Sequence, residues 1–95
     1  MGKYATLIVG RGFSPPAEVR VEGFYVTVFV EAEDVDEAIS KALTFIVEDD
    51  DEFLANIAPY ADPDRAEVAP EHWYELSSFD GCELPRSGFV FFSKD

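Results

Sequence analysis

The chain has 95 residues, of which 20 are Asp or Glu and 7 are Lys or Arg, and 47% are hydrophobic. This apolar content excludes an intrinsically disordered chain, and the length suits one hydrophobic core, so residues 1–95 are predicted to form a single domain. The single cysteine excludes an intramolecular disulfide and favours a reducing compartment. Met1–Gly10 lacks a signal-peptide pattern, and no stretch approaches the roughly 20 apolar residues of a membrane helix. We therefore expect a cytoplasmic protein.

The formal charge of −13 limits the partners that the surface can attract. Phosphate backbones and anionic lipids would be repelled, so neither nucleic acid nor a membrane is expected as a partner. The same long-range field attracts a basic protein. Acidic residues also keep an aromatic-rich domain soluble or adapt a protein to high salt, and this second interpretation stays open.

The first part of the chain predicts two strands separated by a long connection. Tyr4–Val9 is rich in β-forming residues, Gly10–Pro16 interrupts it, and β-forming content returns from Val19 to Val30. The second strand alternates between two faces, with Phe24, Val26, Val28 and Val30 on one and Tyr25, Thr27, Phe29 and Glu31 on the other.

A helix is predicted to follow the second strand directly. Asp34 is a suitable N-cap, and Glu37 lies three residues later, where it completes a capping box. Both acids suit the positive end of the helix dipole. From Val35 onward the apolar residues recur at helical spacing, which predicts that one face of the helix packs on the sheet.

The acidic run at positions 48–52 predicts a break in this helix. Acids are unfavourable at a helix C-terminus and favourable at a helix start, so we expect the first helix to end near Glu48 or Asp49. A short second helix then runs through Phe53, Leu54 and Ile57 and ends before Pro59.

The last part of the chain predicts a loop and two more strands. Tyr60–Pro70 contains two prolines and no periodic pattern, so a loop is expected there. His72–Phe79 is predicted as the third strand and Asp80–Gly81 as a turn. The fourth strand, Gly88–Phe92, follows Cys82–Ser87.

The resulting order β-β-α-(α)-β-β favours an α+β fold: a four-stranded, mainly antiparallel sheet with one main helix and one short helix. The main helix can cover one face of this sheet, yet the second and fourth strands are apolar on both faces. The second face is therefore expected to be covered by the short helix, by the loops at 10–23 and 59–70, or by another molecule.

Catalytic and metal-binding patterns are weak. His72 and Cys82, the single histidine and the single cysteine, lie on either side of a predicted turn, but no nucleophile motif surrounds either residue. The acidic run lacks the twelve-residue calcium loop, and Gly10–Gly12 lacks the ending of a phosphate-binding loop. We therefore expect no catalytic residue, no metal site and no cofactor.

The residues expected to bind a basic partner are the acidic run and two adjacent aromatics. Neighbouring strand residues point to opposite faces, so at least one of Trp73 and Tyr74 is expected to face outward, although each also fits a core or edge position. The candidate binding residues are Glu48, Asp49, Asp50, Asp51, Glu52, Trp73 and Tyr74.

Two resemblances accompany these patterns. The segment Gly23–Ala32, followed by Glu33–Ala38 and later by the Gly88–Phe92 strand, resembles a strand–helix element of small uncharacterised acidic bacterial proteins. That resemblance implies no activity and transfers no site. In size and acidity the chain is also similar to bacterial immunity proteins, which block a toxin by presenting carboxylates to its basic surface.

Three functional hypotheses follow. The first is an acidic protein-interaction module that binds a basic protein, with toxin neutralisation as an immunity protein as its sharpest form. The second is a homodimer that pairs sheet faces or edge strands, and the third is a small enzyme or metal-dependent protein that uses His72 and Cys82. Acidic residues gathered on one face of the fold would favour the first hypothesis, whereas an even spread would count against it.

Overall fold

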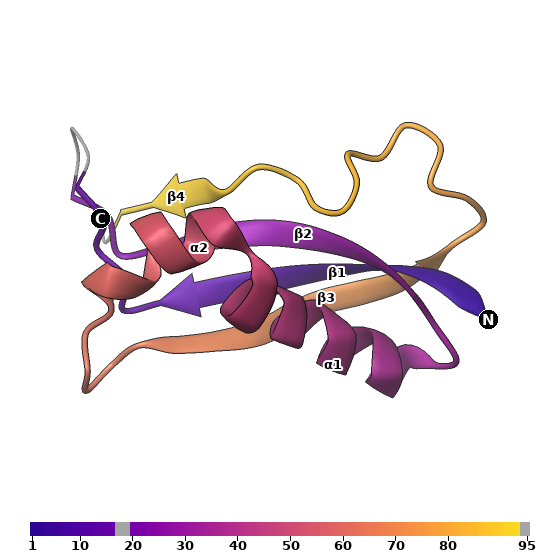
Figure 1. Ribbon diagram of the computed structural model, residues 1–95, viewed down its shortest axis with the longest axis horizontal. Helices are drawn as coiled ribbons and strands as arrows, with labels where there is room; N and C mark the ends of the chain where they lie inside the picture. The colour runs from indigo at the N-terminus through magenta and orange to yellow at the C-terminus, as the bar shows by residue number, and fades with distance from the viewer. Residues whose placement is uncertain (17–19, 94–95) are drawn as a thin grey trace.

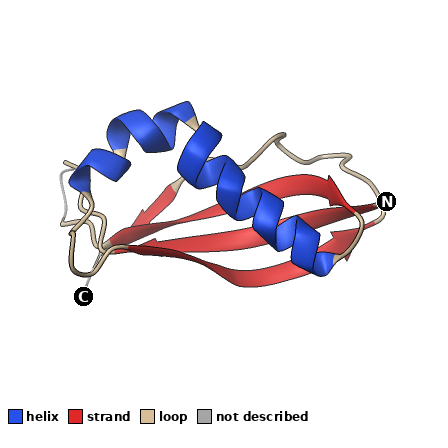
Figure 2. Cartoon of the chain, turned by 60° about the horizontal axis from the view of Figure 1, so that its bottom comes forward, coloured by secondary structure: helices blue, strands red, loops and turns tan. Residues whose placement is uncertain are grey.

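The computed structural model describes residues 1–16 and 20–93, and these residues form a helical layer packed on one face of a sheet (Figures 1 and 2). The elements in chain order are β1 (Gly2–Arg11), β2 (Gly23–Ala32), α1 (Val35–Thr44), the π-helical turn η1 (Phe45–Asp49), α2 (Asp51–Asn56), the 3-10 turn η2 (Ala58–Tyr60), β3 (Glu67–Leu76) and β4 (Val90–Phe92). The sheet order is β3-β1-β2-β4, and all neighbouring strands are antiparallel. The predicted α+β fold is confirmed, while Val19, where the second strand was expected to begin, lies outside the described residues.

The two central strands place alternate residues under the helices. Tyr4, Thr6 and Ile8 of β1 lie opposite Val30, Val28 and Val26 of β2, and Phe24 lies opposite Gly10. A side chain at Gly10 would overlap the ring of Phe24, so this glycine leaves the space that the ring occupies.

The helix boundaries follow local capping chemistry, as predicted. The Asp34 carboxylate accepts a hydrogen bond from the backbone N–H of Glu37 at 2.8 Å. The Glu37 carboxylate accepts from the backbone N–H of Glu33 at 2.9 Å, one residue before the expected donor. Asp50 caps α2 by accepting from the backbone N–H of Phe53 at 2.9 Å, so the acidic run does begin a new helix.

The expected loop at Tyr60–Pro70 is wrong at its end, because β3 already begins at Glu67. Proline cannot donate a ladder hydrogen bond, but an edge strand tolerates it, and β3 is an edge of this sheet. The register also shifts here: Leu7 lies opposite His72 and Ile8 opposite Pro70, so Glu71 is the extra residue of a bulge. The strand ends at Leu76, before the expected Phe79.

The fourth strand, Val90–Phe92, is shorter than the expected Gly88–Phe92, and Phe89, just before it, lies on the helical side. Its ring packs edge-on against Phe24, with a centroid distance of 5.3 Å. The segment before it runs along β2: the backbone N–H of Phe29 donates to the carbonyl of Pro85 at 3.0 Å, and that of Ser87 donates to Thr27 at 2.8 Å. The segment from Pro85 to Ser87 therefore extends the sheet edge beyond β4.

The core lies between the sheet and the helical layer, and three aromatic rings from separate segments meet there. Phe13, Phe24 and Phe53 pack edge-to-face, with centroid distances of 5.5–5.8 Å. Phe13 belongs to the loop after β1, and Ala61, after η2, packs against the same cluster. These loops thus complete the core on the helical side, and the interpretation that they cover the second sheet face is wrong for the described residues.

Thr6 is a buried polar side chain within this apolar layer. The residue is completely buried, and its hydroxyl has no hydrogen-bond partner among the residues that the structure describes. An unsatisfied buried hydroxyl costs its desolvation free energy.

We expect the Thr6→Val substitution to raise the free energy of unfolding by about 1 kcal/mol, because it replaces this hydroxyl with a methyl group of similar size. Chemical denaturation of both proteins measures the change. Thr27→Val, at a half-buried position on the other sheet face, is the control and should change stability by less than about 0.5 kcal/mol. A loss of stability in Thr6→Val would show that the hydroxyl is hydrogen-bonded in solution.

Candidate functional site

The acidic residues are concentrated in one part of the fold. The segment Glu33–Glu52, here called the acidic segment, contains nine Asp or Glu residues and one Lys, and so carries −8 of the total charge of −13. It comprises the turn before α1, then α1, η1 and the start of α2, which lie together on one side of the sheet (Figure 2). This segment is therefore the densest stretch of negative charge in the chain, while the other eleven Asp and Glu residues lie outside it.

The five residues of the acidic run do not have equivalent environments. Glu48, Asp49, Asp51 and Glu52 are exposed, whereas Asp50 is only 4% exposed. Asp50 caps α2 and pairs with a guanidinium, so its role in the structure is to hold the junction between η1 and α2. The four exposed carboxylates remain as candidate binding groups.

Arg86 is the cation at this junction. Its Nε donates to the Asp50 carboxylate, its Nη2 donates to Glu52 at 3.0 Å, and its Nη1 donates to the carbonyl of Ser87 at 2.7 Å. The guanidinium also lies 4.4 Å from the ring centroid of Phe89. These contacts connect the segment just before β4 to the start of α2.

The side chain of Arg86 is only 17% exposed, and its charge is balanced by two carboxylates. Desolvation lowers the pKa of the guanidinium, but the hydrogen bonds and negative charges of Asp50 and Glu52 outweigh this effect and raise the pKa above its ordinary value. Sequence reasoning missed Arg86. The available signal was its isolation, since it is the single basic residue between Arg65 and Lys94.

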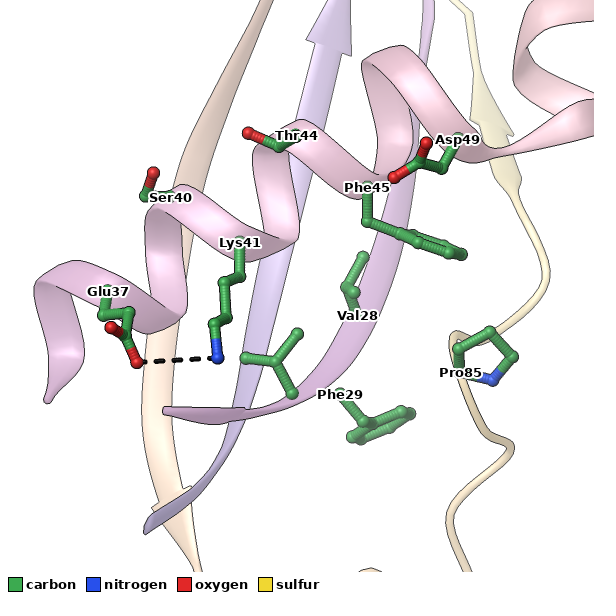
Figure 3. Close-up of a pocket in the computed structure, with 10 residues that line it drawn as sticks. Val28, Phe29, Glu37, Ser40, Lys41, Thr44, Phe45, Asp49 and Pro85 are labelled. Carbon is green, nitrogen blue, oxygen red and sulfur yellow. Dashed lines mark ion pairs between the residues drawn. The ribbon is translucent and has the colours of Figure 1, made fainter. Parts of the chain in front are cut away.

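A groove of about 430 Å³ lies between α1–η1 and β2 (Figure 3). Lys41, Phe45 and Asp49 contribute from the helical side, and Val28, Val30 and Pro85 from the sheet side. We call it the α1–β2 groove. Its wall is apolar in the middle and charged at both ends, and Asp49 is the member of the acidic run that lines it.

Trp73 and Tyr74 lie on opposite faces of β3, as predicted. Trp73 lies opposite Thr6, on the helical side, and Tyr74 opposite Ala5, on the other side. The two residues are 42% and 49% exposed. Among the described residues β3 contacts β1 and α1 but neither η1 nor α2, so the structure does not bring these aromatics together with the acidic run.

The sheet face away from the helices, here called the open face, is rich in aromatics. Its members, identified from the register, include Leu7, Tyr25, Phe29, Tyr74, Val90 and Phe92. Phe79, from the segment after β3, covers one part of it by packing against Phe29 with a centroid distance of 6.3 Å. The homodimer hypothesis stays a prediction, because nothing in the structure shows what covers the rest of this face.

His72 and Cys82 lie in different surroundings. His72 is exposed on β3, with its ring 5.8 Å from that of Tyr74, and Cys82 lies in a turn where its backbone N–H donates to Phe79 at 3.0 Å. No hydrogen bond joins the two side chains within residues 1–16 and 20–93. The same residues contain no group of three or more His, Cys, Asp or Glu side chains placed to hold a metal ion.

Comparison of the chain with protein-family models, with curated proteins and with solved structures gave no significant match. Within the described part of the chain, no helix combines the length and the apolar composition needed to cross a membrane. The site must therefore be interpreted from its own geometry.

We expect the Arg86→Met substitution to lower the free energy of unfolding by about 2–3 kcal/mol, because it leaves the buried Asp50 carboxylate without its cation. Urea denaturation measures the loss. Arg11→Met is the matched control, since Arg11 and Glu71 are both about half exposed and 3.8 Å apart, and it should cost less than about 0.5 kcal/mol. Equal, small losses for both variants would mean that water replaces Arg86 around Asp50.

Proposed function

We propose that this protein is an acidic interaction module that binds a basic protein through the exposed carboxylates of its helical layer. The observation that carries the proposal is the uneven distribution of charge. The acidic segment holds −8 of the −13 charges and occupies one side of the fold. A surface of this kind steers a basic partner toward one face and sets its orientation.

The structure of the junction also supports a binding role for these residues. Arg86 pairs with Asp50 and Glu52 and so neutralises part of the charge of the acidic run. Glu48, Asp49 and Asp51 are exposed, and none of them forms an ion pair among the described residues. These three exposed carboxylates repel one another, and a cationic side chain of a partner would relieve that repulsion.

The sharpest form of the proposal is an immunity protein that neutralises a bacterial toxin by covering its basic surface. Such a partner would release the repulsion within the acidic run when it binds. The single cysteine is consistent with a reducing compartment, so we place this function in the cytoplasm.

We expect the Glu48→Gln/Asp51→Asn variant to lose affinity for the basic partner, on the order of tenfold, because two exposed carboxylates are removed from the contact surface. The measurement is retention from a lysate of the source cells on the immobilised protein, with elution in rising NaCl and identification by mass spectrometry. The partner should elute at lower salt from this variant than from the original protein.

Glu83→Gln/Asp80→Asn is the matched control, because it makes the same change of net charge at two exposed positions outside the acidic segment. The proposal requires that this control and the unmodified protein release the partner at the same salt concentration. Equal losses in both variants would show that only total charge matters, and the absence of any stoichiometric basic protein would remove the proposal.

A further inference from the structure

We propose that the α1–β2 groove receives an arginine side chain of the basic partner, with its aliphatic stem against Phe45 and Pro85 and its guanidinium at Asp49. This inference rests on the proposed function and adds the anchor of the interface. General charge attraction would bring a basic partner to the helical layer. A groove that binds one defined side chain would also fix the position of the partner on that layer.

The middle of the groove can bury an aliphatic stem. Phe45 projects from the helical side and Val28 lies opposite it on β2 (Figure 3). Pro85 lies on the far side of the same cavity. The volume of about 430 Å³ lies within the range of small-ligand pockets, roughly 300–1,000 Å³, and accommodates one long side chain. Arginine buries its methylene groups along such apolar walls while its charge stays at the rim.

The two ends of the groove differ in charge. At one end Lys41 is already neutralised, because its ammonium group donates to the carbonyl of Glu31 at 2.9 Å and lies 3.5 Å from the Glu37 carboxylate. This bound ammonium is poorly available to an anionic ligand. The charge at the Lys41 end of the groove is therefore already compensated within the protein.

At the other end the Asp49 carboxylate has no hydrogen bond or ion pair within the described ranges 1–16 and 20–93. It lies one helical turn beyond Phe45, on the same side of the helix (Figure 3). A carboxylate next to an aromatic ring fits a guanidinium, which forms paired hydrogen bonds with the carboxylate and stacks on the ring. An arginine side chain in the groove would thus place its guanidinium at the Asp49 end, next to the acidic run.

The test is a titration of the ¹⁵N-labelled protein with N-acetyl-arginine amide, followed by the amide shifts of Val28, Phe45 and Asp49. We expect a saturable change at these residues. N-acetyl-citrulline amide, which keeps the shape of arginine and lacks its charge, should bind at least about tenfold more weakly. Equal binding of both probes, or the absence of saturation with the arginine probe, would overturn the inference.

Asp49→Asn should weaken the arginine probe about tenfold, because it removes the charge at the open end of the groove. Asp64→Asn is the matched control: it makes the same chemical change at an exposed position that lies outside the acidic segment and does not line the groove. It should leave the dissociation constant within about twofold. An equal loss in both variants would assign the binding to the general acidic field and would overturn the groove as the site.

The probe titration and the lysate experiment can fail separately. If the arginine probe does not bind but Glu48→Gln/Asp51→Asn still releases the partner at lower salt, the groove inference is wrong and the proposed function stands. If the probe binds as expected but no basic protein is retained, the groove is a binding site for a guanidinium group and the proposed function is wrong.

Discussion

The guanidinium of Arg86 connects the segment before β4 to the start of α2. Its hydrogen bonds reach Asp50, 36 residues earlier, at the point where η1 ends and α2 begins. Five consecutive acids at the end of one long helix would oppose the helix dipole. The break at Asp50 converts this helix end into a new helix start, and Arg86 supplies the countercharge that lets the capping carboxylate remain buried. This contact joins α2 to the C-terminal segment at the surface, while Phe53 and Phe89 join the same two segments within the core.

An asymmetric molecule results from this arrangement. The helical layer contains the acidic segment and the α1–β2 groove, while the open face of the sheet is rich in aromatics. On the open face, β1 and β2 carry no acidic residue around Leu7 and Phe29. Glu31, opposite Lys3 near the end of the strand pair, is the one acidic residue of these two strands. A basic partner and a neutral apolar partner would therefore meet different sides of the protein. This separation is why the charge of the chain can be interpreted as a binding feature as well as an aid to solubility.

The features that could be predicted from the sequence are those that depend on residues close together in the chain. The cap at Asp34 and the helix break at the acidic run were predictable, because capping and dipole effects act within one helical turn. The alternation of β2 was predictable for the same reason. Pro70 was misinterpreted as part of a loop, because its tolerance depends on the edge position of β3, which is a property of the whole sheet.

The candidate site was less predictable, because it depends on contacts between distant segments. The seven candidate residues were treated as one binding surface, but Trp73 and Tyr74 lie on the edge strand β3, which contacts neither η1 nor α2, where the acidic run lies. Asp50 could not be distinguished from its acidic neighbours without the position of Arg86. The α1–β2 groove likewise requires the crossing of α1 over the sheet, which no local pattern specifies.

The most direct test of this account is a double-mutant cycle between Asp50 and Arg86, measured by urea denaturation of Asp50→Asn, Arg86→Met and the combined variant. Asparagine keeps the helix cap, so the cycle isolates the charge interaction from the capping hydrogen bond. The account predicts a coupling free energy of about 1.5 kcal/mol or more between the two residues. Additive effects, within about 0.5 kcal/mol, would contradict the central role of this ion pair.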